Sequence, residues 1–195
     1  MGTEFELKFR ATPQVLQKAA EDLCGPRQQF SMETTYYDNA LGQLSQRHWT
    51  LRRRLENGIS ICTLKTPAPD GGRAEFELEC DSIEQALPEL CKLSRQPELR
   101  LLTAKDVIPV CGAKFQRLAI TVSLTDCTVE VALDQGVLFG GNKQIDLCEL
   151  EVELKSGSRI SAVAYAKALA FTYQLEQEHH SKFRRALALA KGEIL

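Results

Sequence analysis

The patterned part of the chain opens with E-F-E-L-K-F-R at residues 4–10, in which charged and apolar side chains alternate strictly. Successive side chains of a β-strand point to opposite faces, so this period of two predicts a strand with one charged and one apolar face. The same alternation returns later in the chain, at residues 73–80, 115–124, 127–134 and 146–154. Further strands are predicted near residues 32–38, 49–56 and 59–66, the last two joined by a hairpin turn at Asn57-Gly58.

Predicted helices interrupt this strand pattern. A Ser or Thr side chain can accept a hydrogen bond from the free N–H groups at a helix start, and proline is favoured at the first helical position. These signals predict helices over residues 13–23, 83–91, 158–171 and 181–192, with N-caps at Thr12, Ser82, Ser158 and Ser181. Residues 95–112 carry two prolines and a mixed pattern, so no single element is predicted there.

Length and composition suit one domain, and we expect it to span residues 1–195, although the length also allows two small domains. Hydrophobic residues make up 44% of the chain and charged residues 26%, which is ordinary for a globular protein. The formal net charge of −2 provides no general attraction to nucleic acid or to a membrane surface. No apolar run reaches about 18 residues, and no signal-peptide pattern follows Met1. We therefore expect a cytoplasmic protein, monomeric or homodimeric, without a nucleic-acid or membrane partner.

The seven cysteines are predicted to be free thiols. Their number is odd and no pair is spaced C-x-x-C, which argues against a disulfide or zinc framework. Free cysteines commonly serve as small core hydrophobes in a reducing compartment. The three histidines, His48, His179 and His180, are predicted to be exposed and not to bind metal.

The arrangement of the charges is more informative than their sum. Glu149, Glu151 and Glu153 project the same way, roughly 6–7 Å apart along a strand. Carboxylates this close repel one another unless cations lie between them. Arg52 and Arg54 share a face in the same manner, whereas Arg53 is predicted to point outward.

One amphipathic strand normally turns its charged face to water. Five strands whose charged faces hold little else favour a barrel with those faces directed inward, around a multivalent anion and its metal ions. The apolar outer faces would be covered by the helices. Glu75, Glu77 and Glu130 share these charged faces and could lie near an exposed mouth of the barrel.

The order of the motifs resembles the CYTH, or triphosphate tunnel metalloenzyme, family across residues 4–185. Glu4-x-Glu6-x-Lys8 is similar to the ExExK signature of that family. Further similar segments are Tyr36-Tyr37-Asp38, Leu51-Arg52-Arg53-Arg54, Thr63-Leu64-Lys65, Arg73-x-Glu75, Arg117, residues 132–136, residues 148–154 and Ser181-Lys182-x-x-Arg185. The segments at 132–136 and 148–154 are especially similar to bacterial members with inorganic triphosphatase activity.

This resemblance implies an α+β fold, an eight-stranded antiparallel β-barrel with helices packed outside. It implies that the triphosphate is bound by Lys8, Arg52, Arg54, Lys65, Arg73, Arg117, Lys182 and Arg185. It implies that Mg²⁺ or Mn²⁺ is held by Glu4, Glu6, Glu149, Glu151 and Glu153, because all-oxygen ligands suit these ions and not zinc. Lys8, Asp134 and Lys182 would act in catalysis, Asp134 either by holding an inward cation or by orienting water.

The activity implied is metal-dependent hydrolysis of a small-molecule triphosphate, with inorganic triphosphate giving pyrophosphate and phosphate. Class IV adenylyl cyclases and thiamine triphosphatases share the signature and stay open as alternatives. Trp49 could stack on a thiamine ring or belong to the core. A non-catalytic module that binds polyphosphate or nucleotide is a further alternative, although pure anion binding does not require the glutamates.

Overall fold

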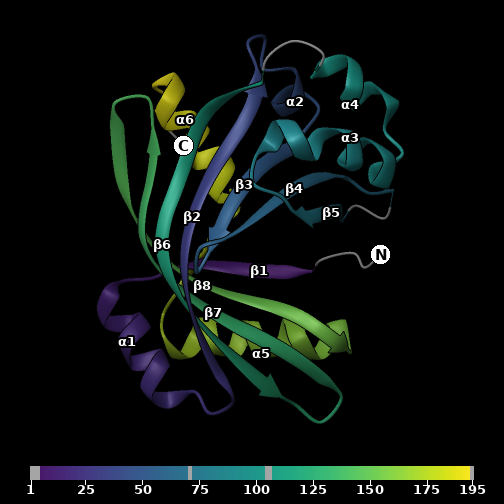
Figure 1. Cartoon of the computed structure of the whole chain (residues 1–195). Coiled ribbons are helices and arrows are strands. Elements are labelled where there is room, and N and C mark those ends of the chain that lie inside the picture. The colour runs from purple at the N-terminus through teal and green to yellow at the C-terminus, as the bar shows by residue number, and fades with distance from the viewer. Residues whose placement is uncertain (1–4, 70–71, 104–106, 194–195) are drawn as a thin grey trace.

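A computed structural model describes residues 5–69, 72–103 and 107–193 (Figure 1). Its strands form one antiparallel sheet in the order β5-β4-β3-β2-β6-β7-β8-β1-β9. The strands are β1 (Glu6–Arg10), β2 (Arg27–Asn39), β3 (Thr50–Glu56), β4 (Ile59–Pro67), β5 (Arg73–Glu79), β6 (Val107–Ser123), β7 (Cys127–Gly140), β8 (Lys143–Gly157) and β9 (Glu176–Gln177). The helices are α1 (Pro13–Asp22), α2 (Gln43–Gln46), α3 (Ile83–Ser94), α4 (Pro97–Leu102), α5 (Arg159–Thr172) and α6 (Lys182–Lys191).

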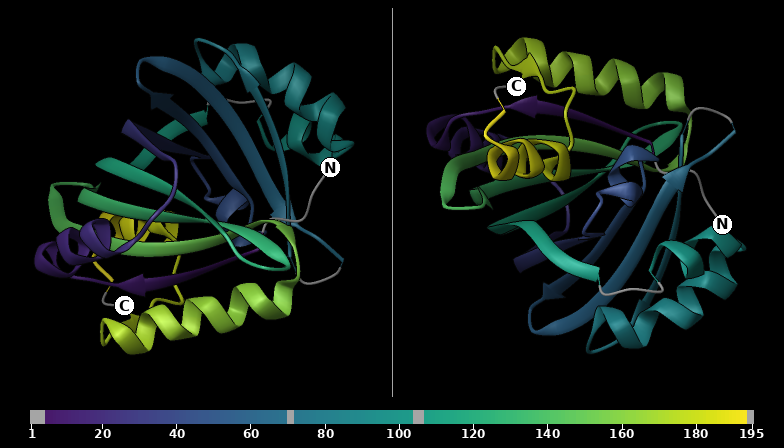
Figure 2. Two further views of the ribbon diagram at one scale, coloured as in Figure 1. Left: turned by 90° about the horizontal axis from the view of Figure 1, so that it is seen from below. Right: turned by 90° about the horizontal axis from the view of Figure 1, so that it is seen from above.

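The predicted antiparallel sheet is confirmed, with α1, α3, α4 and α5 packed outside it. Helix α6 instead packs on the inner face, where Phe183 contacts Tyr36. Strands β1–β8 are the eight expected from the sequence, and a two-residue strand, β9, adds to them. The sheet curls like a tunnel, but within the described part of the chain its edge strands, β5 and β9, are not joined by backbone hydrogen bonds. The curl produces two walls, with α3 and α4 outside the first and α5 outside the second (Figure 2).

The four predicted N-caps are confirmed. The hydroxyls of Thr12, Ser82, Ser158 and Ser181 each accept a hydrogen bond from the backbone N–H three residues later. Helix α3 extends one turn beyond its predicted end despite an internal proline. The unassigned segment contains α4 and the first residues of β6. Helix α2 was not predicted; the Asp38 carboxylate accepts hydrogen bonds from the N–H groups of Leu44 and Ser45.

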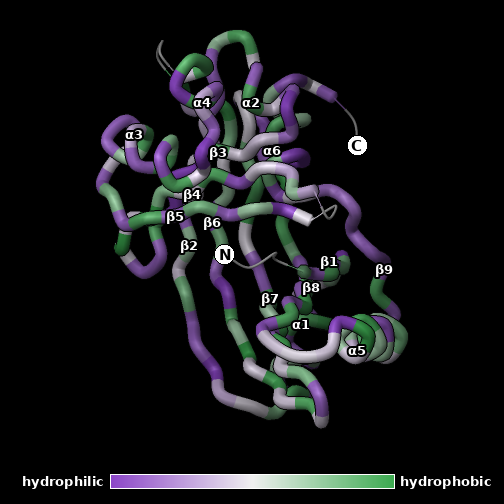
Figure 3. The backbone as a smooth tube through the Cα atoms, turned by 90° about the vertical axis from the view of Figure 1, so that its right-hand side faces the viewer, coloured by the Kyte–Doolittle hydropathy of each residue, from purple (hydrophilic) through white to green (hydrophobic). Residues whose placement is uncertain are grey.

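The outer faces of the two walls form separate apolar cores. One core lies between α1, α5 and the strands β1, β6, β7 and β8. The second lies between α3, α4 and the strands β3, β4 and β5, and it contains Trp49, which is 7% exposed. Apolar and hydrophilic residues alternate along much of the sheet (Figure 3), most strictly in β1, β5 and β8. Burying the apolar face of these strands directs their charged face to the inside of the curl.

Two further expectations concern the cysteines and membrane-spanning helices. All seven cysteines are unpaired thiols, as predicted. No helix in the described ranges combines the length and the apolar character needed to cross a membrane.

Candidate functional site

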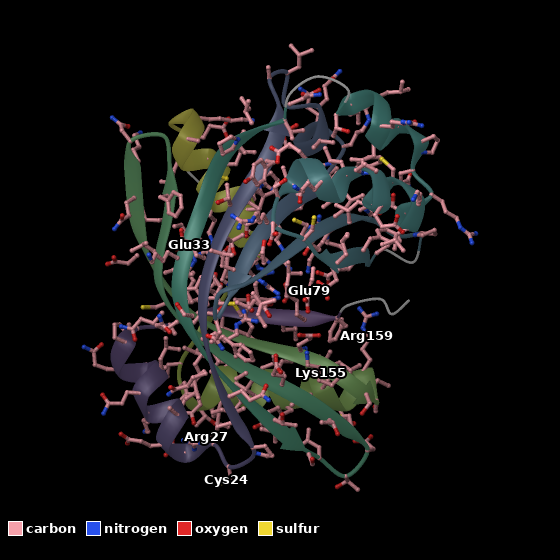
Figure 4. All side chains as sticks on the ribbon, in the orientation of Figure 1. Cys24, Arg27, Glu33, Glu79, Lys155 and Arg159 are labelled. Atoms are coloured by element: carbon pink, nitrogen blue, oxygen red, sulfur yellow. The ribbon has the colours of Figure 1, made fainter. Side chains whose placement is uncertain are left out.

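The inside of the curl is a cavity of about 420 Å³. Strands β1–β8 and the start of α6 all contribute to it. Figure 4 shows the side chains and labels Lys155, near the end of β8. The charged residues that line the cavity are Glu6, Lys8, Arg52, Arg54, Glu56, Lys65, Arg73, Glu75, Glu77, Arg117, Glu130, Glu151, Glu153, Lys155 and Lys182.

The wall formed by β3, β4 and β5 carries cations around one carboxylate. Arg52 and Lys65 both contact the Glu75 carboxylate, each at 3.2 Å. Burial disfavours the charged form of Glu75, but Lys65 and Arg52 outweigh it and hold the pKa of that carboxyl below its ordinary value. Glu75 therefore lies inside the cavity in an ion-paired network, rather than at an exposed mouth.

Two arginines on this wall have guanidinium N–H groups without a hydrogen-bond partner among the described residues. They are the N–H groups at the buried Nε atoms of Arg52 and Arg54. Burial, together with the neighbouring Arg52, lowers the pKa of Arg54 to about 10, although Glu56 contacts its guanidinium. A buried donor without an acceptor is costly, so this wall favours an incoming anion.

The opposite wall contains a buried ionic cluster centred on Lys182. Its ammonium lies 2.9 Å from Asp134, 2.5 Å from Glu149 and 2.6 Å from Glu151. Arg117 donates two hydrogen bonds of 2.7 Å to Asp134 and one of 2.6 Å to Glu151. Arg185 contacts Glu149 from the other side.

Burial and neighbouring charges shift the pKa values of this cluster in opposite directions. Burial opposes ionisation of Glu151, but Lys182 and Arg117 outweigh it, so its pKa lies well below the usual range. For Glu149, burial dominates the attraction of Lys182 and raises the pKa. The Lys182 pKa is raised well above its ordinary value, because the pull of Asp134 and the two glutamates overcomes burial.

Asp134, Glu149 and Glu151 also have oxygens close enough to share one metal ion, within 4.8 Å of one another. In this structure three cations already balance these three carboxylates, namely Lys182, Arg117 and Arg185. A metal ion at this point would have to displace Lys182. The cluster is therefore well suited to fix Lys182 and Arg117 at the cavity wall.

A second group of carboxylates forms a row across three neighbouring strands. Glu6 is paired directly with Glu153, and Glu153 with Glu130. Like charges directly opposite one another on a sheet are destabilising. Lys8 lies 2.9 Å from Glu6, and Lys155 lies 2.9 Å from Glu153 and 3.6 Å from Glu130, which relieves this repulsion.

Most of the residues predicted from the sequence converge on the cavity. Those that line it are Glu6, Lys8, Arg52, Arg54, Lys65, Arg73, Arg117, Glu151, Glu153 and Lys182. Asp134, Glu149 and Arg185 do not line the cavity, but Asp134 and Glu149 lie on the same inner face of the sheet, where α6 buries them in the ionic cluster. Glu4 lies outside the described residues. Arg53 is not among the lining residues and donates to Ser60 instead.

Sequence reasoning missed several charged members of the site. Lys155 continues the period of two beyond Glu153, so the alternation could have identified it. Glu56 follows Arg54 in the same way. Glu178 is 3% exposed and accepts a 2.7 Å hydrogen bond from Arg10, but it follows an irregular segment that carries no such signal. Of the histidines, His48 and His179 are exposed as expected, whereas His180 is half-buried beside Glu178.

The lowered pKa of Glu75 predicts a pH dependence. A carboxyl with a depressed pKa contributes stability above its unfolded pKa of about 4.5, and this contribution is lost as the pH falls through the folded pKa. Glu75→Gln should therefore reduce the free energy of unfolding at pH 7 and much less at pH 2–3. Urea titrations of both proteins at the two pH values measure this. An equal loss at both would show that Glu75 is not stabilised by its cations.

A sequence model of the CYTH domain family matches residues 2–187, and the chain therefore belongs to the CYTH domain family. It is 27% identical over 201 residues to an inorganic triphosphatase from Haemophilus influenzae, an alignment that covers all of this chain. The chain spans 57% of the length of that relative.

Solved structures share the fold. A Bacillus halodurans protein provisionally described as an adenylate cyclase superposes with a TM-score of 0.62 at 16% identity, covering 94% of this chain and 96% of that one. A Hippeastrum protein provisionally described as an adenylyl cyclase, with a dominant triphosphatase activity, gives a TM-score of 0.61 at 18% identity, covering 98% and 97%. These likenesses support the fold.

Proposed function

We propose that this chain, as a single domain, hydrolyses inorganic triphosphate to pyrophosphate and phosphate. The observation that carries the proposal is the convergence of Lys8, Arg52, Arg54, Lys65, Arg117 and Lys182 on one cavity. Arginine binds phosphate oxygens with two parallel donors, while lysine supplies a movable point charge. A linear polyanion is the ligand that makes use of cations on two facing walls.

Binding would proceed by exchange of partners. In the absence of ligand, the lining cations contact carboxylates, such as Arg52 with Glu75 and Lys8 with Glu6. A triphosphate offers these cations oxygens of higher charge, and the carboxylates they leave become available for another cation. Anion and metal would therefore bind together more favourably than either would alone.

The carboxylate row of Glu6, Glu130 and Glu153 fits a divalent cation best. Its members are aligned across β1, β8 and β7 and present only oxygen donors, which suit Mg²⁺ or Mn²⁺. We propose Glu6 and Glu153 as ligands, with Glu151 as a further candidate. Glu4, which lies outside the described residues, stays a candidate from the sequence alone. When bound, the ion supplies positive charge against the phosphate oxygens and the leaving group. Glu149 is completely buried against Lys182 and Arg185, and we assign it instead the role of their counter-charge.

The side chains of this protein would bind the substrate, stabilise developing charge and position the catalytic cations. Arg52, Arg54 and Lys65 bind the polyphosphate along one wall, with Arg73 at their end. Lys8, Arg117 and Lys182 approach it from the other wall, and Lys182 can follow charge that develops on the leaving pyrophosphate. Asp134 holds Arg117 and Lys182 in place, and so acts as a positioning residue.

The proposal predicts a large stabilisation by ligand. Tripolyphosphate with Mg²⁺ should raise the melting temperature, because it binds the folded chain and relieves repulsion in the cavity. At a ligand concentration 100 times its Kd, mass action contributes about 2.7 kcal/mol. Differential scanning calorimetry with millimolar tripolyphosphate, and with orthophosphate as control, measures the shift. No difference between the two anions would argue against a polyphosphate site.

An organic triphosphate is the second candidate, and the cavity wall gives a reason to test it. Phe30, Met32 and Phe115 line the cavity beside the cations and could contact a base or thiazole ring. Trp49, in contrast, belongs to the core. Side-by-side assays of tripolyphosphate, ATP and thiamine triphosphate discriminate the candidates. Cyclic AMP with pyrophosphate from ATP would indicate a cyclase, and binding without turnover would indicate a non-catalytic module.

The free thiols are consistent with a reducing compartment, so we propose a cytoplasmic location for this activity.

A further inference from the structure

Tyr36 lies on the cavity side of β2, the strand that connects the two walls. It is paired with Arg52 on β3 and with Cys111 on β6. The register between β2 and β6 shifts between Tyr36 and Tyr37, and such irregularities commonly redirect a side chain. Tyr36 is 5% exposed and lines the cavity, whereas Tyr37 packs against the core behind β3 and β4.

The Tyr36 ring is held in place by α6. The ring of Phe183 packs against it in a tilted arrangement, with the two centroids 5.0 Å apart. Phe183 directly follows Lys182, so the same turn of helix positions the aromatic ring and the central ammonium of the ionic cluster. The position of the phenol is therefore coupled to that of Lys182.

The Tyr36 hydroxyl makes no hydrogen bond with any described residue. The charges that act on it most strongly are Arg52 and Lys182, one from each wall. Burial raises the pKa of the phenol, which keeps it protonated and able to donate. Both cations are donors only, so the charged groups that act on it most strongly offer the hydroxyl no acceptor.

We infer that the Tyr36 hydroxyl donates a hydrogen bond to a phosphate oxygen of the substrate, between Arg52 of one wall and Lys182 of the other. This inference rests on the proposed function and names a substrate-binding residue that the charge pattern did not reveal. A phenol donor is directional, whereas an ammonium attracts from any side. Tyr36 would thus orient one phosphoryl group that the cations hold by charge.

Tyr36→Phe tests this role because it keeps the ring against Phe183 and removes only the hydroxyl. Hydrogen bonds to charged groups are strong, so we expect tripolyphosphate to bind at least about tenfold more weakly, and kcat/KM to fall in proportion. Isothermal calorimetry, with and without Mg²⁺, and phosphate-release assays measure the two effects. Tyr37→Phe, one residue further and on the opposite face, should change neither.

The melting temperature separates binding from structure. Since the hydroxyl has no hydrogen-bond partner among the residues that the structure describes, the ligand-free melting temperature should not fall in Tyr36→Phe. The increase caused by tripolyphosphate should shrink. Wild-type affinity and turnover in the variant would overturn the inference and leave the proposed function intact. A lowered ligand-free melting temperature with unchanged affinity would also overturn it, in favour of a structural role. Weaker binding with no turnover by either protein would support Tyr36 and refute the hydrolase.

Discussion

Replacing Lys182 with alanine should destabilise the fold and reduce turnover of tripolyphosphate at least about tenfold. The substitution leaves Asp134, Glu149 and Glu151 buried with one cation fewer. Removing one partner of a buried ion pair typically costs about 3–5 kcal/mol, because the remaining charge is uncompensated. The catalytic loss corresponds to ~1.4 kcal/mol or more. Chemical denaturation and steady-state rates, corrected for the folded fraction, measure both quantities.

Two further variants separate these effects. Lys191→Ala, at the exposed end of the same helix, should change neither stability nor rate appreciably. Lys182→Arg keeps the positive charge but replaces a flexible ammonium by a rigid planar group, so it should retain much of the stability and still lose turnover. If Lys182→Ala and Lys191→Ala have equally small effects on the rate, α6 contributes packing only.

Glu6→Gln should abolish turnover while the fold and much of the anion binding persist. Glu6 lies in the carboxylate row beside Glu153 and contacts Lys8, a contact that we propose is released when an anion binds. A neutral amide is a poor ligand for Mg²⁺ or Mn²⁺, so the metal-dependent step should be lost. Rates measured across a titration of each metal, together with calorimetric binding of tripolyphosphate, distinguish loss of metal from loss of substrate.

A matched control exists on the outside of the sheet. Glu33 is also a strand glutamate paired with a lysine, Lys114 at 3.3 Å, but it lies away from the cavity (Figure 4). Glu33→Gln should leave the rate unchanged. Were Glu6→Gln to fold and keep more than about a tenth of the wild-type rate, a loss below ~1.4 kcal/mol, Glu6 would not be a metal ligand.

The strand pattern could be predicted from sequence because each wall buries one face only. The period of two in β1 and β8 specifies which side chains share a face, and the hydrogen-bonded registers preserve that sorting. The helix starts could also be predicted, because each depends on a hydrogen bond between residues close in sequence. In α6, for example, the Ser181 hydroxyl accepts from the N–H of Arg184. The short helix α2 was not predicted, because the carboxylate that accepts hydrogen bonds from its first N–H groups belongs to Asp38, four residues before Gly42.

The extent to which each charged side chain is buried could not be predicted from this alternation. Glu149, Glu151 and Glu153 are equivalent by spacing, yet Glu149 is completely buried while Glu153 lines the cavity beside Lys155. The difference arises from α6, which places Lys182 and Arg185 against Glu149 after a long separation in sequence. The charge pattern could not identify Tyr36 either. Its proposed role as a hydrogen-bond donor depends on which cations surround its hydroxyl.

The central claim is that the inward cations bind a triphosphate and that the chain cleaves its terminal bond. The most direct measurement is phosphorus NMR of tripolyphosphate incubated with the protein and Mg²⁺ or Mn²⁺. Our account predicts pyrophosphate and orthophosphate in equal amounts, and no reaction when the metal is removed by a chelator. Tripolyphosphate that stays intact with both metals, in a sample shown by calorimetry to be folded, would contradict it.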